Sequence, residues 1–164
     1  MKIAIRSIIL LCIVLWLGGI LFFPIVAATA FTYLPDTHTA GTIVGHCLRI
    51  LHYEGLISGA LIVLLLLVAQ AVKALPRSVL VPVALTLIML GFTAYSQFSI
   101  IPHMEHDRIA AGGAIDAVPP NNPYRMDFNR LHGRSETVEE GVLLAGIILV
   151  VLLAANYPKS ESKA

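Results

Sequence analysis

Four long apolar blocks, separated by shorter polar segments, dominate the pattern of the chain. The blocks are Ile8–Phe31, Ile43–Val72, Val79–Ile101 and Thr137–Tyr157. A helix of roughly 20 residues crosses a hydrocarbon core of roughly 30 Å, so each block has the length of a membrane-spanning helix. The pattern therefore predicts an all-α membrane protein, an antiparallel four-transmembrane-helix bundle. It forms a single domain over residues 1–164, with an outer loop over residues 102–136.

Composition agrees with this prediction and leaves little chain for anything else. Hydrophobic residues make up 57% of the 164 residues and charged residues 13%, about half the charged share of a soluble domain. Too few residues remain outside the blocks to form a soluble catalytic domain, so the sequence does not favour an enzyme. The net charge of +1 gives no reason to expect a nucleic-acid partner, and the lipid bilayer is the expected environment.

The basic residues predict the orientation of the bundle. Every lysine falls at the ends of blocks that would share one side of the membrane, whereas residues 32–40 contain no Lys or Arg. The predicted outer loop holds four arginines, but it is long and mixes them with acids. Because cytoplasmic segments carry the excess of Lys and Arg, we expect both termini to be cytoplasmic. The residues on the predicted cytoplasmic side are Lys2, Arg6, Lys73, Arg77, Lys159 and Lys163.

The start of the chain also imitates a signal peptide. Met1–Arg6 is basic, and Ala28–Ala30 is a stretch of small residues. The apolar run from Ile8 is nevertheless longer than the roughly 7–15 residues of a usual signal core, so we expect a retained helix.

Two blocks carry stripes that are expected to face the interior of the bundle. Residues on one helix face recur in alternating steps of three and four. In the second block such a stripe consists of Gly45, Arg49, His52, Leu56, Gly59, Val63, Leu66 and Gln70. In the third block it consists of Thr86, Thr93, Ser96 and His103, with Gln97 beside it.

The fourth block has an apolar run, Gly141–Ala155, that is too short to span a membrane by itself. An added turn draws Glu139 and Glu140 toward the bilayer. One interpretation makes them cap acids, since Thr137 and Glu140 fit a capping box. The other makes them intramembrane carboxylates, which are rare and usually functional. Arg49 lies at a similar depth, so we expect it either to pair with one of these acids or to reach the lipid headgroups alone.

Short motifs along most of the chain resemble a known membrane family. In the first half they are Trp16-Leu17-Gly18-Gly19, Phe22-Phe23, Phe31, Leu34-Pro35, Ala40-Gly41, Val44-Gly45, Arg49 and Tyr53. Before the last block they are Arg125, Phe128, Leu131-His132 and Ser135. Together they are similar to the four-helix bacterial membrane family related to transmembrane protein 205. The resemblance implies the four-helix fold and a bacterial inner membrane, and it brings no established reaction. That family often has Asn at the position of Glu139 or Glu140, so it implies no role for these acids.

The polar residues gather near the outer ends of the predicted helices, and all six histidines lie there. The first functional hypothesis is that this outward-facing cluster binds or passes a small solute or ion, because polar sites between helices are typical of transporters. The candidate residues are Arg49, His52, Glu54, Gln97, His132, Glu139 and Glu140.

Two alternatives stay open. In the first, the histidines bind a metal or haem. His103, Met104 and His106, with His46, suit copper, and His52 with His132 could supply two axial haem ligands. The motif at Trp16 also loosely resembles copper-resistance membrane proteins. The competing interpretation is that these histidines are amphipathic residues at the headgroup boundary.

In the second alternative, the chain is a non-catalytic helical subunit, either of a homo-oligomer or of a complex with another membrane protein. The pair Gly18-Gly19 in the first block would permit the close helix contact that such a role needs.

Overall fold

The computed structural model describes residues 2–74 and 78–155, and within them it is helical apart from short turns. The elements are α1 (Lys2–Tyr33), α2 (Thr37–Ala71), α3 (Leu80–Tyr95), the π-helical turn η1 (Ser96–Ile100), α4 (Ile101–Ala110), the short 3₁₀ helix η2 (Ile115–Ala117) and α5 (Pro123–Ala155). The predicted all-α class is confirmed. Four residues that carried predictions lie outside the described residues, namely Arg77, Tyr157, Lys159 and Lys163.

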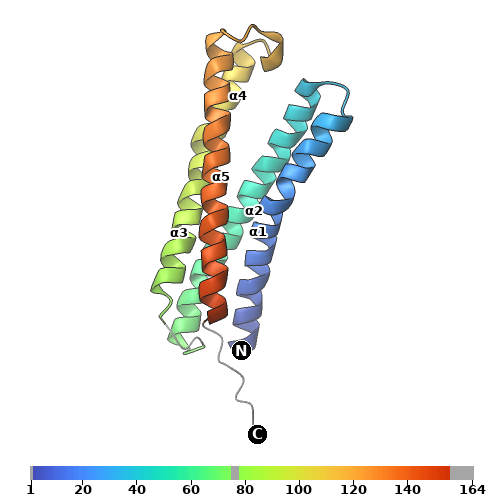
Figure 1. Cartoon of the computed structure of the whole chain (residues 1–164). Helices are drawn as coiled ribbons and strands as arrows, with labels where there is room; N and C mark the ends of the chain where they lie inside the picture. Colours follow the sequence, from blue (N-terminus) through green and yellow to red (C-terminus); the bar gives the residue numbers. More distant parts are fainter. Residues whose placement is uncertain (1, 75–77, 156–164) are drawn as a thin grey trace.

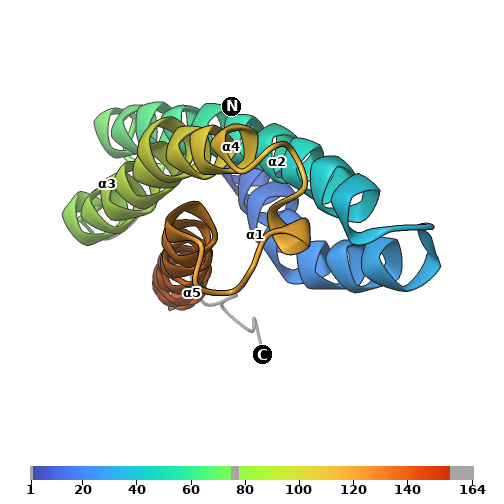
Figure 2. The same ribbon diagram turned by 90° about the horizontal axis from the view of Figure 1, so that it is seen from above.

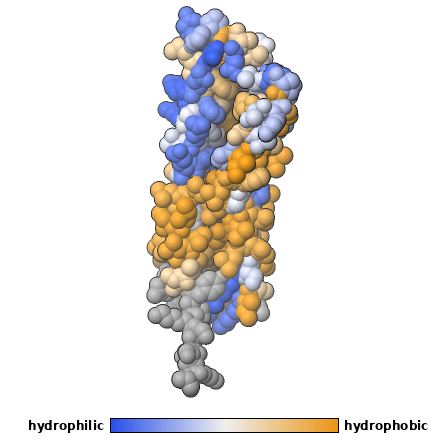
Figure 3. All heavy atoms as spheres, turned by 45° about the vertical axis from the view of Figure 1, so that its right-hand side comes forward, coloured by the Kyte–Doolittle hydropathy of each residue, from blue (hydrophilic) through white to orange (hydrophobic). Residues whose placement is uncertain are grey.

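Four helical stretches are long and apolar enough to cross a membrane, as expected of a multi-pass membrane protein. They are Lys2–Tyr33, Thr37–Ala71, Leu80–Ala110 and Pro123–Ala155, the third of which joins α3, η1 and α4. Figure 1 shows these stretches lying side by side. On the face drawn in Figure 3, a hydrophobic band crosses the molecule, with a more hydrophilic surface beyond it at one end.

Two names for the ends of the molecule are used below. The polar end holds the α1–α2 turn at residues 34–36 and the α4–α5 connection at residues 111–122. The terminal end is the opposite one, where α1 begins and α5 ends (Figure 1). At the terminal end the Arg6 guanidinium donates a hydrogen bond to the Ala74 carbonyl and so ties α1 to the residues after α2.

The helices extend well beyond the predicted blocks at the polar end. The predicted outer loop, residues 102–136, contains most of α4 at its start and the first part of α5 at its end. Helix α5 begins at Pro123, and the Asn122 side chain accepts hydrogen bonds from the Tyr124 and Arg125 amides at 2.9 and 3.4 Å. The predicted capping box is wrong, because Thr137 lies inside α5 and its hydroxyl donates to the Gly133 carbonyl at 3.0 Å.

Helix α1 packs against α2 through an aromatic ring that lies on glycine. The Trp16 side chain is 1% exposed, and its indole covers Gly55 and Gly59 of α2 so closely that neither position has room for a Cβ atom. Glycines allow two backbones to approach in a membrane, where packing rather than water exclusion drives helix association. The close contact between α1 and α2 is therefore made by Trp16 of α1 and the glycines of α2. Gly18 of α1 faces outward, and a Cβ atom added there would have no neighbouring atom within 4 Å.

The buried face of α2 is offset from the predicted stripe. His52, Gly59 and Leu66 are buried as predicted, but Gln70 is exposed. The face is completed by residues that the stripe did not include, which are Gly55, Ser58, Ile62 and Ala69. The offset arises because α2 packs chiefly against α1 and α3, so its buried surface faces two neighbours rather than a bundle axis.

The α1–α2 turn ends in a helix cap that should respond to acid. Asp36 Oδ1 accepts a hydrogen bond from the Thr39 amide at 2.7 Å, and Oδ2 accepts one from the Thr39 hydroxyl at 2.8 Å. These bonds, the backbone one first, lower the pKa of the Asp36 carboxyl. A lowered pKa stabilises the cap above the ordinary pKa of about 3.9, and this stabilisation is lost as the pH falls through the folded-state value. We therefore expect acid to lower the protection factors of the amides in the first turn of α2, that is, their protection relative to the intrinsic exchange rate at each pH, whereas Asp36→Asn should remove this pH dependence. Equal acid sensitivity in both proteins would contradict it.

Candidate functional site

A buried histidine lies between two polar side chains from other helices at the level where the apolar part of the molecule ends. His52 of α2 is 1% exposed. Its Nδ1 lies 3.1 Å from Gln97 Oε1 of η1, and its Nε2 lies 2.6 Å from Glu139 Oε1 of α5. The Glu139 side chain keeps 18% of its surface exposed. Both ring nitrogens are therefore engaged, and the carboxylate is the accessible member of the group.

The position of Gln97 follows from the π-helical turn η1. Pro102 has no N–H to donate to the Phe98 carbonyl, and its ring crowds that oxygen. The helix widens into η1 just before the proline, a type of irregularity that is frequent at functional sites. Neighbouring residues of an α-helix point about 100° apart, yet Ser96 and Gln97 are both buried here, at 0% and 6% exposure. Two successive polar side chains of this turn therefore face the interior.

More hydroxyl groups lie beside these residues. The Ser96 and Ser135 Oγ atoms are 3.3 Å apart and link η1 to α5. Thr93 lies one turn before Gln97 and is 1% exposed, and its Oγ1 has no hydrogen-bond partner among the described residues. The predicted third stripe is therefore confirmed at Thr86, Thr93, Ser96 and Gln97, all buried, and wrong at His103, which is exposed. We call His52, Thr93, Ser96, Gln97, Ser135 and Glu139 the polar core.

The polar core joins α2 and α5, two helices that share α3 as a neighbour but have little direct backbone contact with each other. Helix α2 packs mainly against α1 and α3, whereas α5 packs mainly against α3 and α4. Figure 2 shows α5 and α1 on the same side of the row formed by α2, α3 and α4. The contact of His52 with Glu139 therefore links α2 to α5 through side chains rather than through close backbone packing.

A comparison with known protein families finds a family that matches part of the chain. Residues 11–108 match the family described as Domain of unknown function (DUF4149), which is more than half of the chain. The chain belongs to the DUF4149 family. No curated protein and no solved structure matches it. The matched residues include His52, Thr93, Ser96 and Gln97, whereas Ser135 and Glu139 lie beyond them. For this DUF4149 protein, a relation to transmembrane protein 205 and a bacterial source stay predictions.

The expected ion pair between Arg49 and an acid of the last helix is wrong for this DUF4149 protein. Glu139 contacts His52, one turn after Arg49, and Glu140 is exposed. Among the described ion pairs none involves Arg49, whose charge acts instead on Glu105 of α4. The prediction failed because depth was inferred correctly but direction was not: Arg49 lies on the side of α2 that faces α4.

Glu54, another predicted member of the cluster, lies apart from the polar core. It follows His52 by two residues and so points to another side of α2. Ser58 donates a hydrogen bond to Glu54 Oε1 at 2.6 Å, while the buried Oε2 has no partner among the described residues. Glu54 is therefore satisfied in part by its own helix.

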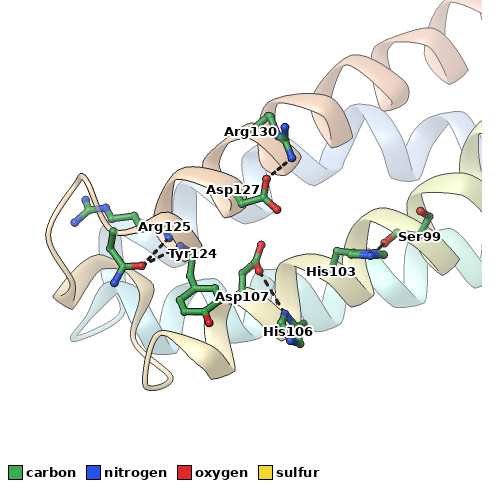
Figure 4. A network of polar contacts seen from close by, with 9 residues as sticks. Ser99, His103, His106, Asp107, Tyr124, Arg125, Asp127 and Arg130 are labelled. Atoms are coloured by element: carbon green, nitrogen blue, oxygen red, sulfur yellow. Dashed lines mark hydrogen bonds and ion pairs between the residues drawn. The ribbon is translucent and has the colours of Figure 1, made fainter.

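Four of the five remaining histidines of the DUF4149 protein, His46, His103, His106 and His132, have local partners. The Nδ1 atoms of His46 and His103 contact the carbonyl oxygens of Thr42 and Ser99, each one turn earlier, at 2.8 and 2.7 Å. His132 lies 3.4 Å from Glu136 and is 60% exposed. Figure 4 shows that His103 and His106 point to different partners, His106 toward Asp107.

This arrangement does not assemble the predicted ligand sets. The described residues contain no group of three His, Cys, Asp or Glu side chains placed to hold a metal ion. The predicted copper residues His46, His103, Met104 and His106 are not gathered into such a group. The predicted haem pair is divided as well, because both nitrogens of His52 are engaged while His132 is on the surface.

Sequence reasoning overlooked three members of the polar core as site residues. The sequence indicated Ser135 only through the family resemblance. It placed Thr93 and Ser96 on an inward-facing stripe but did not predict which helix this stripe contacts. The signal for Ser135 was present, because Ser135, Glu139, Val142 and Gly146 follow steps of four and three along α5. All but Glu139 are buried.

Proposed function

We propose that this membrane protein binds a small ion at the polar core, entering from the polar end, and that the ion is a proton. The observation that carries the proposal is the buried His52 ring, whose two nitrogens face Gln97 Oε1 and Glu139 Oε1. A doubly protonated imidazole donates to both oxygens. A neutral ring is satisfied equally well if the Gln97 amide rotates and donates to Nδ1. The site can therefore gain or lose one proton without leaving a polar group unpaired.

In this proposal the proton reaches His52 through Glu139. Its side chain is partly exposed, whereas His52 is buried, so a proton from the aqueous side meets the carboxylate first. Histidine changes its charge within the physiological range more readily than any other side chain, and ionisable side chains inside membrane segments commonly form proton relays. These properties support uptake at Glu139 and storage at His52.

Binding is supported better than passage across the membrane. The core between the polar core and the terminal end is built from apolar side chains, among them Trp16, Ile62, Leu66, Met89 and Leu149. Passage of a proton across the membrane would need a rearrangement of the helices or a second subunit. Only for passage, therefore, does the proposal include a homo-oligomer or a membrane partner protein.

The proposed orientation places the polar end outside the cytoplasm. Lys2, Arg6 and Lys73 lie at the terminal end, and the positive-inside rule assigns that end to the cytoplasm. We therefore propose an antiparallel bundle with both termini cytoplasmic. The family resemblance supports a bacterial inner membrane as its location.

Imidazole nitrogen NMR of the full chain in nanodiscs tests the proton site. We expect the spectrum to contain a doubly protonated His52 ring that donates to Gln97 and Glu139. Glu139→Gln should remove the doubly protonated form, because the amide cannot neutralise the buried cation. The matched control is Glu136→Gln, which removes the surface partner of His132 and should leave His52 unchanged. A His52 ring found only in one neutral tautomer would overturn the proposal.

Proteoliposomes separate binding from passage. A pH gradient that decays faster with the wild-type protein than with Glu139→Gln would extend the proposal to proton passage. Decay equal to that of protein-free liposomes would restrict it to binding.

A further inference from the structure

The Thr93 hydroxyl, on the side of the polar core that faces the terminal end, is buried without a hydrogen bond. The residue is almost fully buried, and its Oγ1 has no partner within the part of the chain that the structure describes. Leaving a buried hydroxyl unpaired is costly, and native proteins satisfy such groups with protein atoms or with ordered water. Thr93 therefore indicates a ligand at this position.

A second buried threonine of α3 shows the usual solution. Thr86 lies two turns before Thr93 on the same face of the helix and is fully buried. Its hydroxyl donates to the Pro82 carbonyl, four residues earlier, at 2.8 Å. The Thr93 hydroxyl makes no such bond to the Met89 carbonyl. The two threonines share helix, face and burial, but only Thr86 is satisfied by its own helix.

The neighbour of Thr93 on this face offers a second polar contact. Gln97 follows it by four residues, a spacing that makes side chains neighbours on a helix, and is also buried. Gln97 Oε1 faces His52 Nδ1 at 3.1 Å, which leaves the NH2 group of the amide for another partner. No direct hydrogen bond joins Thr93 to Gln97. One water molecule, with two hydrogen bonds of about 2.8 Å each, spans such a gap.

We propose that one water molecule is bound between the Thr93 hydroxyl and the Gln97 amide. The chemistry of the two groups favours water over a metal cation, because the NH2 group that faces away from His52 only donates hydrogen bonds. Water accepts from this group and exchanges a hydrogen bond with the hydroxyl. It thereby has the minimum of two polar partners that a buried water needs.

This water gives the Gln97 amide freedom to turn, a role that rests on the proposed function. When the His52 ring is doubly protonated, Gln97 Oε1 accepts from the ring and the NH2 group donates to the water. When the ring is neutral and the amide rotates, Oε1 turns toward the water and accepts from it. Because water both donates and accepts, neither end of the amide is left unpaired when the proton leaves.

Solid-state NMR of the full chain in liposomes, with isotope-labelled threonine methyl groups, tests the water site. Polarisation transferred from water protons should reach the Thr93 methyl group several-fold faster than the Thr86 methyl group, since both are buried but only Thr93 borders a bound water. Equal transfer to the two methyl groups would overturn the proposal.

Replacement by valine, which has the same shape and no hydroxyl, gives a second measurement. Thr93→Val removes one partner of the water and should lower the unfolding temperature. Thr86→Val is the matched control and should change it less, because the Pro82 carbonyl keeps the backbone hydrogen bond of the helix. A Thr93→Val protein that is more stable than the wild type would overturn the proposal, because it would mean that the hydroxyl was unpaired.

The water site and the proton site can fail separately. Rapid transfer to Thr93 together with a His52 ring found only in a neutral tautomer would support the water and overturn the proposed function alone. A doubly protonated ring together with equal transfer to Thr86 and Thr93 would support the proposed function and overturn the water.

Discussion

Replacing His52 by leucine should lower the free energy of unfolding by about 3 kcal/mol, because it leaves Gln97 and Glu139 without their shared partner. An unsatisfied buried polar group costs roughly 1–3 kcal/mol, and a carboxylate near the upper end of that range. The Gln97 side chain is nearly fully buried, so water cannot replace the lost contact there. Reversible unfolding in mixed micelles, followed by circular dichroism, measures the change.

Two further variants separate the polar contact from a general loss of packing. His132→Leu is the matched control on α5, since His132 is 60% exposed, and its effect should stay within about 0.5 kcal/mol. The double variant His52→Leu with Glu139→Leu should be more stable than His52→Leu alone, because two apolar side chains replace a buried polar pair at little net cost. Equal stability of His52→Leu and His132→Leu would mean that the polar core does not hold the helices together.

Replacing Gly55 by leucine should cause a second large loss, in the contact between α1 and α2. A Cβ atom at position 55 would lie 2.8 Å from Trp16 Cδ1 and Cε2, atoms of a rigid and fully buried ring. Overpacking of this kind typically costs about 1–3 kcal/mol and occasionally more, and the longer leucine side chain should reach at least the upper end. We expect a lower yield of monodisperse protein and a lower unfolding temperature.

Gly18→Leu is the matched control for this experiment. Gly18 lies on α1 in an outward-facing position, and a Cβ atom added there would have no neighbouring atom within 4 Å. The change in helix propensity is the same at both positions, so only the steric contact differs. If Gly55→Leu and Gly18→Leu unfolded alike, the close approach of Trp16 to α2 would not be a determinant of stability.

The four spanning helices could be predicted from hydropathy because the bilayer imposes their length. The same argument fails beyond the bilayer, where water satisfies backbone groups and length is no longer constrained. The first turns of α5 contain Arg125, Asp127 and Arg130, a polar composition that is compatible with helix but carries no apolar run to mark its length. Its start was marked by Asn122 and Pro123, a polar cap followed by proline at the first helical position, which is a recognised start signal.

The polar core could be predicted only in part. Counting residues brought Arg49, Glu139 and Glu140 to a similar depth, but it did not bring Gln97 to that level. The contact of His52 with Gln97 and Glu139 depends also on the direction of each side chain around its helix, and a deviation of one residue changes that direction by about 100°. Arg49 and His52 lie on neighbouring parts of α2, so the sequence alone did not decide which of them meets Glu139. The π-helical turn η1 added a second shift that regular helical spacing does not contain.

That turn also gives the chain an unequal tolerance to changes in length. Removing one residue between Ser96 and Ile100 would let the segment return to regular α-helical spacing with little rotation of α4, because five residues of a π-helical turn cover about the same angle as four residues of an α-helix. Asp107, now buried, would keep its direction, whereas a deletion inside regular helix would turn it by about 100°. The connection at residues 111–122 transmits no such rotation, because it is not a continuous helix. A single-residue deletion should therefore be tolerated in η1 and in that connection, and not in the regular part of α3.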